Sequence, residues 1–119
     1  MILPSSTATE LVVWGTVVHL VVDWLFQNEW IAENKTSLRH PAGYVHAVAH
    51  TLALLLVFPP IAAVVLGITH LVIDTRQPLA WWATVMSQTP GGEVGASVHI
   101  WRDQAVHVAT IAVAALICA

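Results

Sequence analysis

The feature that most constrains the fold of this chain is a set of His and Asp side chains placed inside otherwise apolar stretches. They occur as pairs spaced four residues apart, which puts both side chains on one face of an α-helix, about 5–6 Å apart. A bare Asp in an apolar span costs roughly 2.5–3.5 kcal/mol on the insertion scale, so such residues face an interior and find partners there. The pairs are His19 and Asp23, His46 and His50, His70 and Asp74, and Asp103 and His107.

Composition indicates which solvent surrounds these stretches. The 119 residues are 57% hydrophobic but only 9% charged, whereas a soluble domain carries about 25% charged residues. The mean hydropathy is +0.74. We therefore expect one membrane domain, residues 1–119, with the lipid bilayer around most of its surface. No basic patch suggests a nucleic-acid partner, and the single cysteine, Cys118, rules out an internal disulfide.

Proline and glycine divide the chain into helices. Pro59 and Pro60 end one helix, because proline lacks the N–H and disfavours helix in the preceding residue. We expect an all-α fold, namely an integral membrane four-helix antiparallel bundle with a short interfacial helix between the third and fourth helices. Because residues 1–10 hold no Lys or Arg, we expect the first helix to be a retained span and not a signal peptide. The expected helices are 9–27, 44–58, 61–74 and 94–118, with the interfacial helix at 78–88 and loops at 28–43 and 89–92.

The positive charges predict an orientation. In an up-down-up-down bundle all four Lys and Arg residues fall on one side, which the positive-inside rule makes cytoplasmic. This predicts a multi-pass protein of the bacterial inner membrane, with both termini outside and with the loops between the first and second and the third and fourth helices in the cytoplasm. Five tryptophans gather at the same end, as in an interfacial belt. These residues are Lys35, Arg39, Arg76 and Arg102, and Trp24, Trp30, Trp81, Trp82 and Trp101.

The depth of the four pairs indicates a shared site. Two pairs lie late in their helices and two lie early, so in antiparallel order all four converge at the cytoplasmic third of the bundle. Their mixed N/O donors suit Zn, Fe or Mn, whereas Ca and Mg prefer oxygen alone. Eight candidates exceed the four ligands of a structural zinc site, so either two ions bind, or one binds and the other side chains support its ligands. The candidate metal ligands are His19, Asp23, His46, His50, His70, Asp74, Asp103 and His107.

Plainer interpretations exist for these residues. The first pair can form an intrahelical hydrogen bond that neutralises its acid, the histidines of the second helix can be interfacial, and the acids of the third and fourth pairs can lie at the headgroup level. Gln27 and Lys35 are candidate substrate contacts, Lys35 for an anionic group such as phosphate, but can also be ordinary interfacial residues. We interpret His40 as solvated and His99 as a rim residue. The agreement in depth of four pairs favours metal binding over these interpretations.

The same residues form a pattern that resembles a known family. The motifs are H-x-x-x-D-W-x-x-Q from His19, H-x-x-I-D from His70 and D-Q-x-x-H from Asp103, with Lys35 and a histidine at the start of the second helix between the first two. Their order and spacing, over about 18–115, resemble the bacterial and phage membrane proteins catalogued as domain of unknown function 3307. The resemblance implies a multi-pass membrane protein and supplies no activity. A looser likeness is to bacterial inner-membrane proteins described as metal-dependent hydrolases.

Three functions are compatible with this pattern. The first is a metal-dependent hydrolase at the cytoplasmic membrane surface, in which the metal lowers the pKa of a water, Asp23 or Asp103 is the general base, and Lys35 and Arg39 position a lipid or phosphoester. The second is a non-enzymatic small subunit of a larger membrane complex, with histidines that ligate a haem or chlorin; the Asp partners count against haem. The third is an ion or proton pathway, against which the single depth of the pairs counts.

Overall fold

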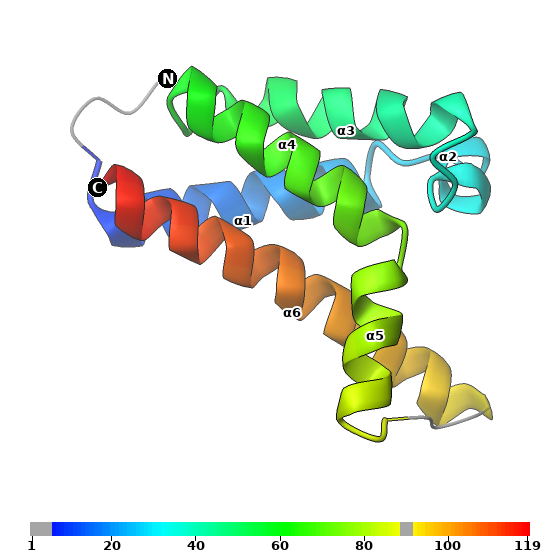
Figure 1. Cartoon of the computed structure of the whole chain (residues 1–119). Helices are drawn as coiled ribbons and strands as arrows, with labels where there is room; N and C mark the ends of the chain where they lie inside the picture. The colour runs from blue at the N-terminus through cyan, green and yellow to red at the C-terminus, as the bar shows by residue number, and fades with distance from the viewer. Residues whose placement is uncertain (1–5, 89–91) are drawn as a thin grey trace.

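Helices form all the regular structure in the described part of the chain. The structure is a computed structural model that describes residues 6–88 and 92–119. Its four longer helices pack in a ring, in which α1 contacts α3, α3 contacts α4, α4 contacts α6, and α6 returns to α1 (Figure 1). The prediction of an all-α fold is confirmed. The four helices are α1 (Ala8–Trp24), α3 (Pro41–Leu54), α4 (Pro60–Asp74) and α6 (Gly92–Cys118).

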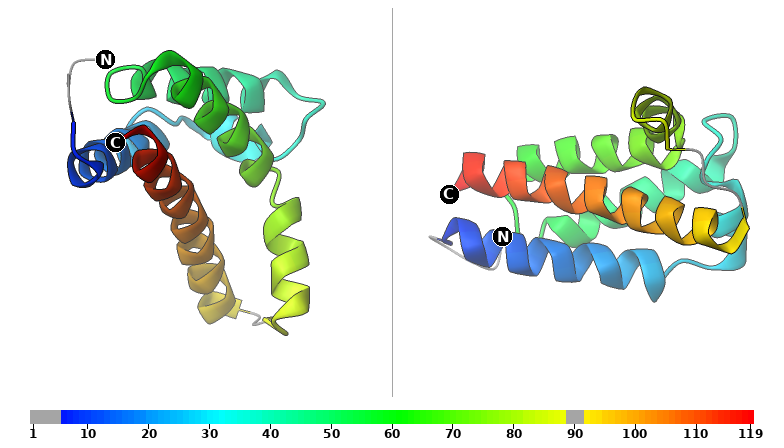
Figure 2. Two further views of the ribbon diagram at one scale, coloured as in Figure 1. Left: turned by 60° about the vertical axis from the view of Figure 1, so that its left-hand side comes forward. Right: turned by 90° about the horizontal axis from the view of Figure 1, so that it is seen from below.

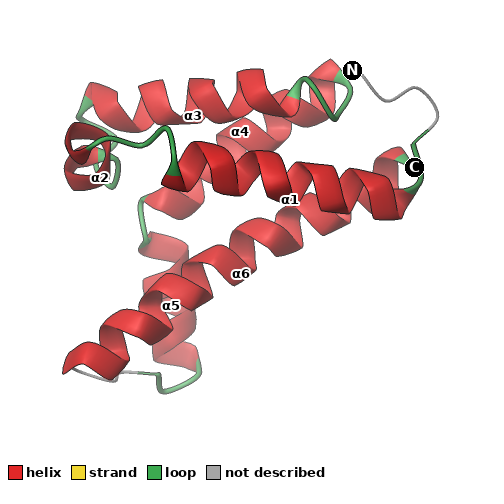
Figure 3. Ribbon diagram, turned by 180° about the vertical axis from the view of Figure 1, so that it is seen from behind, coloured by secondary structure: helices red, strands yellow, loops and turns green. Residues whose placement is uncertain are grey.

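Two short helices lie at the end of the bundle where α1 and α4 finish. Helix α2 (Glu29–Asn34) packs against α3, and α5 (Gln77–Val85) packs against α4 (Figure 3). The sequence did not predict α2, because the stretch 28–43 looked like a polar loop. Its start is set by Asn28, whose Oδ1 accepts a hydrogen bond of 2.9 Å from the backbone N–H of Ile31, as is usual for an N-cap residue.

The helix ends follow from capping residues and prolines. Thr7 and Glu10 form a capping box at the start of α1, in which each side chain accepts from the backbone N–H of the other residue. The start of α3 moves to Pro41 from the expected 44, because Pro41 suits the first turn and His40 caps it: His40 Nδ1 accepts from Ala42 N–H at 3.1 Å. His40 is half-buried and has this capping role, which the sequence did not predict, in addition to its contact with solvent.

The other bounds differ from expectation by a few residues. Helix α1 stops at Trp24 and not at 27, and α3 stops at Leu54 and not at 58, because a turn over 55–58 precedes Pro59. Helix α4 begins one residue before the expected 61, α5 runs three residues short of the expected 88, and α6 begins two residues before 94. The loop expected at 89–92 lies, for residues 89–91, outside the described residues.

The apolar core fills one half of the bundle. It lies near the start of α1 and the end of α6, around the fully buried ring of Phe58, and includes Leu11, Leu54, Leu66 and Ile111. The polar pairs occupy the other half. The first half of α6 extends away from the other long helices, and α5 extends to the same side (Figure 2). Packing at one end therefore holds the four helices so that the other end can enclose polar groups.

The outer surface of the ring is apolar on every long helix. Trp14 on α1, Leu52 on α3, Ile68 on α4 and Leu116 on α6 are 50–72% exposed. Among the described residues one helix, Val94–Cys118, is long and apolar enough to cross a membrane by length and composition, and Pro60–Asp74 is a shorter apolar helix. The structure thus supports membrane association through α6, while four spans stay a prediction.

Candidate metal centre

The eight residues predicted as metal ligands lie together between the four long helices. Seven of them are at most 4% exposed, and the side chain of Asp103 is 17% exposed. Each long helix supplies two, as the spacing of four residues predicts. We call these eight residues the His/Asp cluster: His19 and Asp23 from α1, His46 and His50 from α3, His70 and Asp74 from α4, and Asp103 and His107 from α6.

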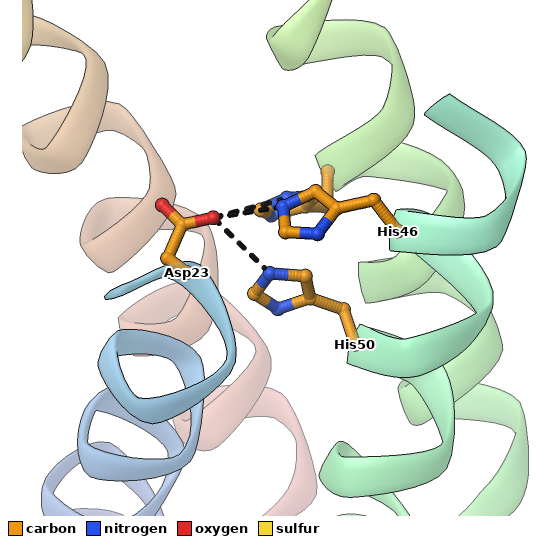
Figure 4. Close-up of side chains that lie close together, drawn as sticks. Asp23, His46 and His50 are labelled. Carbon is orange, nitrogen blue, oxygen red and sulfur yellow. Dashed lines mark hydrogen bonds and ion pairs between the residues drawn. The ribbon is translucent and has the colours of Figure 1, made fainter. Parts of the chain in front are cut away.

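One carboxylate oxygen of Asp23 faces three imidazole nitrogens. Asp23 Oδ1 lies 2.9 Å from His46 Nε2 and 3.3 Å from His50 Nε2 (Figure 4), and 3.8 Å from His70 Nε2. The ligand atoms of a tetrahedral zinc site, each 2.0–2.1 Å from the ion, are about 3.3 Å apart. One ligand atom from each of these four residues lies within 4.8 Å of the other three. The donor types and spacing of the group are therefore compatible with a transition-metal ion.

Asp74 joins this group to the ligands from α6. Its Oδ2 lies 3.0 Å from His70 Nε2, and its Oδ1 lies 3.2 Å from His107 Nε2. His107 Nε2 in turn lies 3.6 Å from Asp103 Oδ1. Asp74, Asp103 and His107 offer a second set of ligand atoms within 4.8 Å of one another. Asp74 therefore lies inside the cluster and not at its edge.

Two imidazole nitrogens in the cluster have no hydrogen-bond partner. His50 and His70 stack with ring centroids 3.6 Å apart. His50 Nδ1 and His70 Nε2 are buried without a hydrogen bond, and Asp74 Oδ2 lies 3.0 Å from His70 Nε2. Since buried polar atoms are nearly always satisfied, each exception needs an explanation. An ion at His70 Nε2 supplies one.

The charges of the cluster also favour a cation. The Nζ of Lys35 lies 3.8 Å from Asp23 Oδ1 and 3.7 Å from Asp74 Oδ2, and its side chain is 11% exposed. This ammonium offsets one of the three carboxylate charges of Asp23, Asp74 and Asp103. Buried charges are costly unless paired or bound to metal. A divalent ion would balance the remaining two charges while the imidazoles stay neutral, as ligation requires.

A family model described as Protein of unknown function (DUF3307) matches residues 11–119. The chain belongs to this family. The comparisons with curated proteins and with solved structures gave no match. Since the DUF3307 description assigns no activity, the function has to be argued from the residues of the site.

In this DUF3307 protein, a close contact between the backbones of α2 and α3 positions Lys35 beside the cluster. Lys35 is the C-cap of α2, and its N–H donates to Ile31 O at 2.9 Å. A Cβ added at Gly43, in the first turn of α3, would lie 2.9 Å from the carbonyl oxygen of Lys35. A glycine there lets the two backbones approach closely. The unpredicted helix α2 and this glycine together place the predicted substrate residue Lys35.

Gln104 is a site residue that the sequence analysis assigned no role. It is 9% exposed, its Nε2 donates to Asp23 Oδ2 at 2.9 Å, and its Oε1 accepts from His19 Nε2 at 2.9 Å. His19 Nε2 is thereby turned toward Gln104, so His19 supports the ligands in this arrangement. The signal that could have identified Gln104 is its spacing three residues before His107, which places both on one helix face.

The remaining candidates lie around the cluster. Gln27 contacts no metal-ligand candidate by a hydrogen bond, and its Oε1 is buried without a partner. His99 Nδ1 lies 3.1 Å from a guanidinium nitrogen of Arg102, at the rim as predicted. Arg39, expected to position a substrate with Lys35, is exposed and lines a different pocket together with Leu38 and Gln77.

A small pocket connects the cluster to the surface. Its volume is about 160 Å³, and both carboxylate candidates for a general base, Asp23 and Asp103, contribute to its wall. The candidate substrate residues Gln27 and Lys35 line it as well. The cluster is therefore accessible to a small group from outside. We call this the polar pocket; its lining residues are Asp23, Trp24, Gln27, Ala32, Lys35, Arg76, His99, Ile100, Asp103 and Gln104.

Proposed function

We propose that this chain is a membrane-embedded metal-binding protein, whose His/Asp cluster holds one or two divalent transition-metal ions (Zn, Fe or Mn) for hydrolysis at the cytoplasmic membrane surface. One observation carries the proposal: Asp23 Oδ1 lies 2.9, 3.3 and 3.8 Å from the Nε2 atoms of His46, His50 and His70, and the four residues offer ligand atoms within 4.8 Å of one another. Nitrogen and carboxylate donors in this ratio suit these metals.

The ligand sets support a second ion. Asp74, Asp103 and His107 form a group separate from the four residues around Asp23, and His70 and His107 also fall in a third group with His19. Paired metals in bundle cores use ligands from facing helices in this way. One ion would occupy the Asp23 group, and a second would bind between Asp74 and Asp103.

The membrane part of the proposal rests on the outer surface. Large apolar side chains such as Ile61, 82% exposed, and Leu116, 72% exposed, face outward around the ring, and lipid is the solvent that accepts such a surface. Helices α1, α3 and α4, with 17, 14 and 15 residues, reach about 21–26 Å at 1.5 Å per residue, so four spans would thin the ~30 Å hydrocarbon core locally.

Embedding with four spans would place the site at the cytoplasmic side of the membrane. With four spans, both termini face outward, and the loops that hold Lys35 and Arg76 face the cytoplasm, as the positive-inside rule requires. Trp24 and Trp81, 58% and 66% exposed, then lie at the interface. The bilayer is the main partner, and other membrane subunits would have to contact the same apolar surface.

Asp23 and Asp103 lie in different surroundings, which suit different roles in hydrolysis. A divalent ion in the cluster would lower the pKa of a water and so supply a nucleophile near neutral pH. Asp23 is enclosed, with Oδ1 near His46 and His50 and Oδ2 bonded to Gln104, which suits a ligand. Asp103 is half-buried at the pocket wall, which suits the acceptor of a proton from water. Lys35 and Gln27 would hold the substrate.

Neither alternative function is favoured by an observation. The histidine ring centroids lie 3.6–5.4 Å apart within the cluster, which leaves no room for a haem or chlorin macrocycle between them. A proton pathway across the bilayer would have to continue through the apolar half of the bundle, which Leu11, Phe58 and Ile111 fill.

The test is hydrolysis by metal-loaded protein in detergent against a panel of esters, amides and phosphoesters. We expect Asp103→Asn to retain the ion of the Asp23 group and lose at least 100-fold in rate, in the range of general-base removal, and His70→Ala to lose both that ion and the rate. Asp103→Asn with full rate would contradict the assignment of the base. Metal-loaded wild type that hydrolyses no member of the panel would contradict the hydrolase proposal.

A further inference from the structure

The polar pocket contains a second cation that the sequence analysis gave no site role. Arg76, between α4 and α5, lines the pocket together with Lys35 at the end of α2. The two residues are far apart in sequence and line the same pocket because α2 and α5 lie at the same end of the bundle (Figure 1). Arg39, which the sequence suggested as the partner of Lys35, does not line this pocket.

Arg76 is held in an unusual backbone conformation. Its φ is 63° and its ψ is 0°, in the left-handed region that non-glycine residues seldom adopt. Its N–H donates to Ile73 O at 2.9 Å as α4 ends, and its carbonyl accepts from Ala80 N–H at 2.9 Å as α5 begins. Such conformations cluster at ligand-binding positions. Glycine or asparagine adopts this backbone conformation more easily than arginine. The backbone conformation therefore does not account for an arginine here, and we attribute its presence to the side chain.

Among the side chains that the structure describes, the guanidinium of Arg76 is unpaired, whereas the acids of the pocket are engaged. No side-chain hydrogen bond or ion pair joins Arg76 to the side chains of residues 6–88 and 94–119. By contrast, Asp23 Oδ2 and Asp103 Oδ2 both accept from Gln104 Nε2, at 2.9 and 3.3 Å. An incoming anion therefore meets an unpaired guanidinium, and the carboxylates turn toward the cluster.

We propose that the polar pocket binds a phosphate group, with Arg76 and Lys35 as its two cationic partners. A guanidinium donates two parallel hydrogen bonds to phosphate oxygens, and two cations match the charge of a phosphate monoester, about −1.5 to −2 at pH 7. This inference rests on the proposed function, because two divalent ions in the cluster would exceed the charge of its three carboxylates and so free Lys35 from offsetting Asp23 and Asp74. The substrate class is then a phosphate ester, either water-soluble or the headgroup of a lipid.

The experiment measures binding without turnover. Full-length protein in detergent, loaded with Zn²⁺ and freed of excess metal, is titrated calorimetrically with inorganic phosphate, and in a second arm with phosphatidic acid in mixed micelles against phosphatidylcholine. The variant is Arg76→Asn, since Asn tolerates the left-handed backbone, and the matched control is Arg39→Asn, which removes an exposed arginine outside the pocket. Arg76→Gly replaces Arg76→Asn if the latter does not accumulate.

We expect Arg76→Asn to raise the Kd for phosphate at least tenfold, while Arg39→Asn and the zinc content of all proteins stay unchanged. Binding of inorganic phosphate would indicate that the free group suffices, and binding of phosphatidic acid alone would indicate a lipid headgroup; both support the site. Equal affinity of wild type and Arg76→Asn would overturn it, as would zinc-loaded wild type that binds neither probe. Wild type that retains no zinc would instead contradict the proposed function.

Discussion

The side-chain amide of Gln104 on α6 donates a 2.9 Å hydrogen bond to Asp23 Oδ2 on α1. This bond connects two residues that are 81 positions apart along the chain and fixes the rotation of the Asp23 carboxylate. Because Oδ2 is occupied, Oδ1 is the oxygen turned toward His46 and His50. The same amide accepts from His19. Gln104 therefore orients an acid and an imidazole at once, without itself being a ligand.

Replacement of Gln104 should weaken metal binding without abolishing it. Gln104→Leu retains much of the side-chain volume but removes all three side-chain hydrogen bonds of Gln104, and loss of such supporting residues costs about 10–100-fold in metal affinity. Competition with a chromophoric chelator would measure the change. Gln77→Leu, on an exposed amide at the start of α5, is the matched control and should match wild type. Unchanged affinity in Gln104→Leu would show that Asp23 needs no such orientation.

Gly43→Ala should displace Lys35 and destabilise the fold. The new Cβ would lie 2.9 Å from the Lys35 carbonyl oxygen, and overpacking of this kind costs about 1–3 kcal/mol. We expect a lower Tm in detergent and weaker phosphate binding, with the metal retained because the ligands of α3 lie further along the helix. A Tm and a phosphate affinity equal to wild type would mean that the α2–α3 contact does not position Lys35.

A charge on the outer face of α4 should prevent membrane insertion. Ile68 lies near the middle of α4 and is 58% exposed. In lipid, Ile68→Asp would cost about 2.5–3.5 kcal/mol, whereas in water an exposed substitution usually changes stability by less than about 0.5 kcal/mol. We expect the variant to be lost from the alkali-resistant membrane fraction, with Ile68→Leu as the control that stays. Recovery of stable Ile68→Asp from the soluble fraction would contradict embedding of α4.

The sequence predicted the His/Asp cluster because its signal is periodic. Pairs at i and i+4 identify one face of a helix. In antiparallel helices, a pair near the end of one helix lies level with a pair near the start of the next. His70 and His107 show this, because both lie beside Asp74. Metal occupancy at this level stays a prediction. The all-α class followed from the same periodicity and from prolines that delimit α4 and α5.

The rest of the site depends on tertiary contacts that leave weak local signals. Helix α2 is only six residues long, so no apolar period reveals it, and the burial of Lys35 depends on Gly43 in another helix. Arg76 reaches the polar pocket because its backbone is left-handed. An arginine in a sequence does not ordinarily predict this backbone conformation. Gln104 stands beside Asp103 in the D-Q-x-x-H motif, but two of its three hydrogen-bond partners, His19 and Asp23, lie on α1.

The central claim is that the His/Asp cluster holds a transition metal, and elemental analysis by plasma mass spectrometry of detergent-purified protein tests it most directly. Wild type is measured beside His70→Ala and the matched control His99→Ala, a histidine of α6 outside the cluster. We predict one or two equivalents of Zn, Fe or Mn in wild type and in His99→Ala, and a loss of at least one equivalent in His70→Ala. Folded wild type without bound metal, or equal metal in His70→Ala, would contradict the account.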